Sequence, residues 1–106
     1  MTTFDKRQEG FEKKFAHDEE LRFKATARRN RLLGQWAAEK LGLSGDEAAA
    51  YAKEVVMSDF EESGDEDVFR KVRADFDAKS VVQSDHQIRR TMTDLMETAI
   101  AEIKAG

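Results

Sequence analysis

Cysteine is absent from the 106 residues of the sequence. The chain therefore cannot form a disulfide framework, a thiolate metal site or a thiol nucleophile. This composition fits a reducing compartment. Long apolar runs are absent as well: no stretch approaches the roughly 20 residues that span a bilayer, and residues 1–10 lack the apolar core of a signal peptide. We expect a cytoplasmic protein with no direct membrane insertion, peripheral to a membrane only through a partner.

The length allows one domain with a single core. Charged residues make up 38% and apolar residues 40% of the chain, which is typical of a folded protein. The net charge of -4 is unevenly distributed, because residues 21–42 hold six Lys/Arg and one Asp/Glu, whereas the segments on either side are acidic. The basic residues either pair internally with the acidic segments or form a contact surface for a partner.

Apolar residues spaced by three and four positions predict a first helix that begins near Leu21 and ends at Gly42 as a left-handed cap. Capping-box patterns at Ser44, Ser63 and Ser84 predict the starts of three more amphipathic helices. No alternating strand pattern or Asn-Gly hairpin signal is present. The predicted fold is therefore all-α, a four-helix bundle over residues 19–106. Gly34 costs the first helix about 1 kcal/mol relative to alanine, and it either permits a close helix crossing or has no packing role.

Residues 1–18 differ from the rest of the chain. Phe4, Phe11 and Phe15 would share one face of a helix, but Gly10 interrupts the segment. An isolated helix shorter than about 12 to 15 residues is marginal in water. We expect this segment to be flexible and disordered when free, and to fold as it binds a partner.

Catalytic patterns are weak. Ser84, Asp85 and His86 are triad residue types, but their adjacency at a helix start favours capping. No P-loop, G-x-G-x-x-G or H-x-x-x-H motif occurs, and the acidic cluster from Asp59 to Asp67 lacks the ligand order of an EF-hand. We expect no enzyme activity, no cofactor and no metal. The arginines of residues 27–31 are the one candidate for nucleic-acid contact, but the chain is acidic and has no second basic patch, so no nucleic-acid binding is expected.

The sequence nevertheless resembles a known family over most of its length. The words that carry the resemblance are MTTFD at residues 1–5, KFAHD at 14–18, FKATARRNRLLGQWAAE at 23–39, YAKEVV at 51–56, DFEE at 59–62 and EDV at 66–68. They resemble the zeta inhibitor subunit of alphaproteobacterial F-type ATP synthase. Only the last helix, from about Ser84, matches poorly.

The resemblance implies a four-helix protein whose mobile N-terminal segment inserts between the alpha, beta and gamma subunits of ATP synthase. There it would block ATP hydrolysis much more than synthesis. Residues 1–18 would be the inhibitory segment, the bundle behind them would hold the protein on the enzyme, and the free protein would be a monomer.

The phenylalanines of the segment are the expected apolar contacts, and the charged residues around them are expected to fix register. The residues predicted to bind the partner are Phe4, Asp5, Lys6, Arg7, Phe11, Lys13, Lys14, Phe15, Arg28 and Arg29. The alternative is a helical adaptor that binds an unrelated protein through the same phenylalanine-bearing tail.

Overall fold

The computed structural model describes residues 19–59 and 65–105 of the chain. These residues form helices α2 (Glu19–Lys40), α3 (Gly45–Ser58), α4 (Glu66–Ala78) and α5 (Asp85–Ala105), with no strand among them. The predicted all-α, four-helix fold is confirmed, and each helix begins within a few residues of its predicted start. Residues 1–18, with the predicted inhibitory segment, lie outside the described residues.

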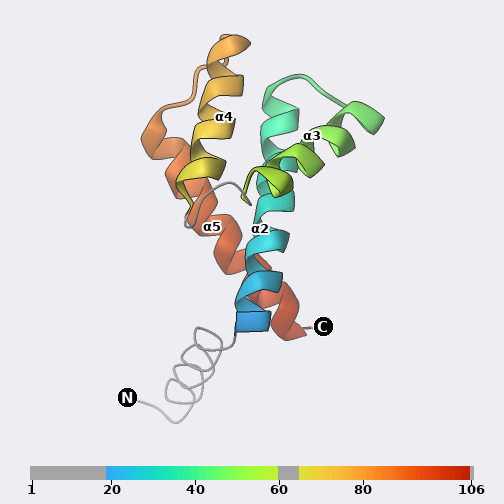
Figure 1. Cartoon of the computed structure of the whole chain (residues 1–106). Coiled ribbons are helices and arrows are strands. Elements are labelled where there is room, and N and C mark those ends of the chain that lie inside the picture. Colours follow the sequence, from blue (N-terminus) through green and yellow to red (C-terminus); the bar gives the residue numbers. More distant parts are fainter. Residues whose placement is uncertain (1–18, 60–64, 106) are drawn as a thin grey trace.

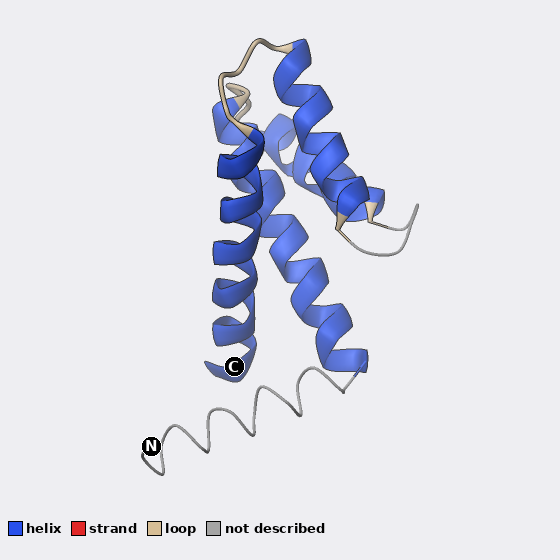
Figure 2. Cartoon of the chain, turned by 90° about the vertical axis from the view of Figure 1, so that its left-hand side faces the viewer, coloured by secondary structure: helices blue, strands red, loops and turns tan. Residues whose placement is uncertain are grey.

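The four helices surround one core (Figure 1). Helix α2 packs on α3 and α5, and α4 packs on the same two helices from the other side. Helices α2 and α5 run antiparallel, and the N-terminal half of α2 and the C-terminal half of α5 extend beyond α3 and α4 (Figures 1 and 2). The fold therefore has a four-helix end and a narrower two-helix end.

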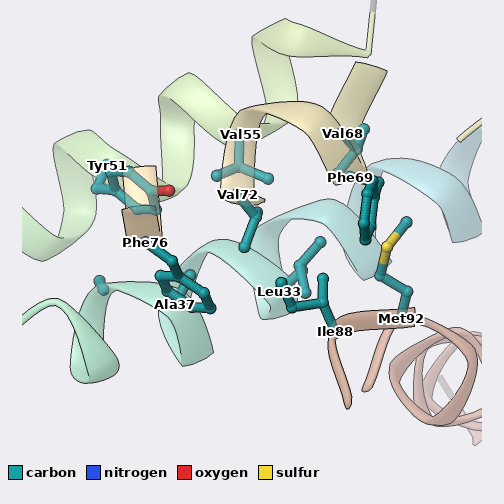
Figure 3. Close-up of a cluster of buried hydrophobic side chains, with 11 residues drawn as sticks. Leu33, Ala37, Tyr51, Val55, Val68, Phe69, Val72, Phe76, Ile88 and Met92 are labelled. Atoms are coloured by element: carbon teal, nitrogen blue, oxygen red, sulfur yellow. The ribbon is translucent and has the colours of Figure 1, made fainter. Parts of the chain in front are cut away.

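The core lies at the four-helix end (Figure 3). Helix α4 has the clearest apolar stripe, since Val68, Phe69, Val72 and Phe76 are all buried. The edge of the Trp36 ring meets Phe76, with ring centroids 5.6 Å apart. The other buried members of the cluster are Leu33, Ala37, Ala38, Tyr51, Val55, Ile88 and Met92. The two-helix end is closed by small side chains, with Ala25 and Ala99 buried there.

The structure tests three of the four predicted helix-end signals, because Ser63 lies outside the described residues. Gly42 adopts a φ of 78°, and Leu43 N–H donates to the Ala38 carbonyl at 2.9 Å, which completes a Schellman motif. Ser84 and Gln87 cap α5 reciprocally, since each side chain accepts a hydrogen bond from the other residue's backbone N–H. The capping box predicted at Ser44 is wrong, because the Ser44 side chain makes no cap hydrogen bond. Gly45 turns into the left-handed region there, with a φ of 56°.

Gly34 marks the closest approach of two helices. A Cβ placed on Gly34 would lie 2.5 Å from the Cα and 3.0 Å from the Cβ of Ala52, in α3. The nearer atom is backbone, so the contact cannot be relieved by rotating a side chain. Of the two roles open for Gly34 in the sequence, the close crossing is the correct one.

Replacing Gly34 with alanine therefore provides a test in which two effects have opposite signs. Helix propensity alone would stabilise the variant by about 1 kcal/mol. The clash should outweigh this gain, and we expect Gly34→Ala to lower the free energy of unfolding by about 1–3 kcal/mol in urea denaturation. Gln35→Ala, at the exposed neighbouring position, should change it by less than about 0.5 kcal/mol. A more stable Gly34→Ala protein would contradict the crossing.

Candidate partner-binding site

Most of the predicted partner-binding residues lie outside the described residues. These are Phe4, Asp5, Lys6, Arg7, Phe11, Lys13, Lys14 and Phe15. Their role in binding stays a prediction. The structure places the other two, Arg28 and Arg29, on α2.

Arg28 links the two helices of the narrow end. Its Nη1 lies 3.4 Å from Oε1 of Glu102, near the end of α5, and both side chains are about half exposed. An ion pair of this exposure contributes at most about 1 kcal/mol. The Arg28 side chain can therefore exchange Glu102 for another carboxylate at little cost.

Arg29 lies in the interior, with only 2% of its side chain exposed. Its Nη2 donates to Oδ1 of Asp65 at 2.7 Å, and its Nε donates to Oδ1 of Asn30 at the same distance. Asp65 directly precedes α4, so this ion pair ties the start of α4 to the middle of α2. Arg29 thus supports the internal-pair interpretation of the basic segment, while its predicted contact with a partner stays untested.

The sequence held a signal for this burial that the basic-stretch interpretation missed. Arg29 falls four residues after Ala25 and four before Leu33, and both of these are buried. Residues four apart share a helix face. A charged residue inside an apolar row indicates a buried pair, although the sequence does not identify Asp65 as its partner.

Asp59 lies at the edge of the same polar region. Partial burial raises the pKa of its carboxyl above the ordinary value, and the charges of Asp65 and Asp67 act in the same direction. The Asn30 amide and the Arg29 guanidinium oppose the shift but do not cancel it. The Asn30 Nδ2 atom is buried and makes no hydrogen bond among the described residues, so its support of the Asp59 charge is weak.

A second polar cluster joins α3 to α4. The Tyr51 hydroxyl donates to Oδ2 of Asp75 at 2.8 Å. Lys71 Nζ lies 3.0 Å from the same oxygen and 3.3 Å from Oε1 of Glu54. Burial, together with the hydrogen bond and charge of Asp75, raises the pKa of Tyr51 well above its ordinary value. The hydroxyl therefore stays protonated and acts as a fixed donor between the two helices.

Carboxylates of the acidic cluster form ion pairs with arginines. Asp65 pairs with Arg29 as described, Glu66 Oε1 lies 3.0 Å from Arg89 Nη1, and Asp67 Oδ1 lies 3.1 Å from Arg70 Nη2. Within residues 19–59 and 65–105, no group of three His, Asp or Glu side chains is arranged to hold a metal ion. The same ranges contain no helix long and apolar enough to cross a membrane.

The triad-like sequence at Ser84 has a structural role. The Ser84 Oγ accepts the Gln87 N–H at 3.1 Å, which confirms the capping interpretation. The described fold and its pairs define an all-α scaffold in which polar side chains join helices to one another.

Comparisons with known proteins identify the family. The sequence profile of ATPase inhibitor subunit zeta matches residues 1–102. A protein with a structure solved by solution NMR is 52% identical, with a TM-score of 0.72 over 80% of this chain and 96% of that chain. No curated protein sequence matches. The chain belongs to the ATPase inhibitor subunit zeta family, whose members are regulatory proteins and not enzymes. The resemblance found in the sequence is therefore confirmed.

Removing the acidic partner of Arg29 should be costly. Asp65→Ala leaves the buried guanidinium without its carboxylate, and we expect the free energy of unfolding to fall by about 1–3 kcal/mol. Asp94→Ala removes an exposed carboxylate from α5 and is the matched control, with an expected change below about 0.5 kcal/mol. Urea denaturation of the three proteins checks this. Equal stability of the two variants would show that Asp65 is not the counter-ion that Arg29 needs.

The raised pKa of Asp59 predicts a pH dependence with a definite sign. The folded chain holds the Asp59 proton more tightly than the unfolded chain does. Protonation of Asp59 therefore stabilises the folded state, and this stabilisation is complete below the ordinary pKa of 3.8. It is lost as the pH rises through the folded pKa. The stability of the natural chain relative to Asp59→Asn should therefore increase as the pH falls from about 7 to about 4.

Urea denaturation across this pH range measures the difference, and Asp94→Asn serves as the exposed control. A difference that stays constant, or that decreases toward acid pH, would contradict the environment described for Asp59.

Proposed function

We propose that this chain inhibits ATP hydrolysis by F-type ATP synthase by inserting residues 1–18 at the catalytic interface of the alpha, beta and gamma subunits. The described helices hold the protein on the enzyme. The observation that supports this proposal best is the span of the family match, residues 1–102, which includes both the N-terminal segment and the helical fold.

The order of the chain supports a division of labour between the two parts. Helix α2 begins at Glu19, immediately after the proposed inhibitory segment, and runs for 22 residues into the core. A segment that becomes helical in a host cavity would therefore connect directly to a long, well-packed helix. Helices α2 to α5 carry the buried core residues Leu33, Val55, Val72, Phe76 and Ile88.

The proposed mechanism is steric. Phe4, Phe11 and Phe15 occupy apolar sites in the cavity, and Lys6, Arg7, Lys13 and Lys14 pair with carboxylates on its walls. A helix held between a rotating subunit and a catalytic subunit stops rotation without forming or breaking a bond. In this proposal the protein reaches the membrane only through the enzyme complex.

Deleting residues 1–16 tests the proposal. The shortened chain should lose inhibition of ATP hydrolysis by the purified enzyme, while circular dichroism of the helices persists. Replacing Phe4, Phe11 and Phe15 together with alanine should weaken inhibition at least about tenfold, because burying each ring contributes roughly 1.5–3 kcal/mol.

Val82→Ala is the matched control, because it removes an apolar side chain that is 93% exposed and lies far along the chain from the segment. It should inhibit as the natural chain does. Full inhibition by the shortened chain would rule out the segment as the inhibitory element. A full-length chain that neither binds nor inhibits the purified enzyme would favour the adaptor function instead.

A further inference from the structure

A groove follows one face of α2. Phe23, Ala27, Arg31 and Gln35 are spaced by four residues and form a single row on the helix. This row lines two adjoining hollows of about 330 Å³ and about 430 Å³, which share Arg31 and Val56. We call the two hollows together the α2 groove.

The walls of the α2 groove come from helices on either side of the row. Helix α3 contributes Ala49, Ala52, Lys53 and Val56, and α5 contributes Ile103 from its last turn. At the close crossing of the two helices, Ala52 of α3 lies directly against Gly34 of α2. Small side chains therefore form part of the groove surface. Ala27, Ala49, Ala52 and Val56 thus give the α2 groove an apolar surface, with Arg31 and Gln35 in the same row as Ala27.

The charge of the α2 groove is opposite to that of the chain. The protein carries a net charge of -4, yet among the described residues no Asp or Glu lines either hollow, whereas Lys24, Arg28, Arg31 and Lys53 do. Lys24 pairs with Glu20 and Arg28 pairs with Glu102. Arg31 and Lys53 form no ion pair with the residues that the structure describes. Two cations, Arg31 of α2 and Lys53 of α3, are therefore free of described carboxylates and can pair with an anionic partner.

We propose that the α2 groove binds an acidic amphipathic helix on the surface of ATP synthase, as a second contact beyond the N-terminal segment. This inference rests on the proposed function. The row from Phe23 to Gln35 spans about 18 Å at 1.5 Å per residue, which matches roughly three turns of a docked helix. Apolar side chains of that helix cover Ala27, Ala52 and Val56, and its carboxylates pair with Arg31 and Lys53.

The occupant is a protein helix because the groove is long, shallow and apolar along its floor. Its cations come from two helices, Arg31 from α2 and Lys53 from α3, so they favour a partner helix that carries acidic residues beside an apolar stripe. Arg28 and Arg31 both line the groove, but Arg28 pairs with Glu102, whereas Arg31 pairs with none of the described carboxylates.

Reversing the two charges tests the proposal on the full chain. The double variant Arg31→Glu and Lys53→Glu should raise the concentration needed for half-inhibition of ATP hydrolysis at least about tenfold, since two charge pairs become repulsive. Lys79→Glu combined with Arg90→Glu makes the same change in net charge at exposed positions outside the groove, and should inhibit as the natural chain does. Circular dichroism and thermal unfolding confirm that both double variants fold.

A cross-link identifies the occupant. Because the chain has no cysteine, Gln35→Cys places a single thiol in the groove, and a photoreactive cross-linker on it should join an acidic helical segment of an ATP synthase subunit. Val82→Cys, outside the groove, should not join that segment. An adduct only with residues 1–18 of the same chain, only with a second copy, or no adduct at all overturns the proposal.

The outcomes separate this inference from the proposed function. If the full chain inhibits, the shortened chain does not, and both groove variants behave as the natural chain does, then the groove proposal fails and the proposed function stands. If the full chain neither binds nor inhibits the enzyme, both fail together.

Discussion

The contact between Gly34 and Ala52 fixes how close α2 and α3 can lie, and the positions of the other helices follow from it. The missing Cβ lets the two backbones meet where an alanine would place atoms 2.5 Å apart. With α3 held there, Tyr51 reaches Asp75 of α4, and Val55 completes a core with Val72. The α2 groove depends on the same approach, because Ala52, which Gly34 meets, also lines one of its hollows.

Charge serves two different purposes on α2. Arg29 is drawn into the interior and meets Asp65, which fixes the point where α4 begins. Arg31, two positions later, faces the groove together with Lys53 of α3. Because two residues advance a helix by about 200°, neighbouring arginines in one basic run lie on opposite faces. The residues of a basic run in a helical sequence should therefore be assigned to helix faces one by one, because they do not form a single patch.

Periodicity was sufficient to predict the four helices, the left-handed cap at Gly42 and the Ser84 cap, because each depends on residues that are close in sequence. The pair between Arg29 and Asp65 could not be predicted in full, because the row of Ala25 and Leu33 indicates burial but long-range packing selects the partner. Ser44 shows the reverse failure, since the local pattern was present and the backbone at Gly45 adopted another geometry. The α2 groove needs three helices to form, so no single stretch of sequence contains it.

The two-helix end of the fold is packed less extensively than the four-helix end. Beyond α3 and α4, α2 is supported by α5 through the small buried side chains Ala25 and Ala99 and through the exposed Arg28–Glu102 pair. A region with so few buried side chains unfolds locally at a lower free energy than a four-helix core does. The first turns of α2 can then absorb a pull or twist from the preceding residues while the core behind them stays closed.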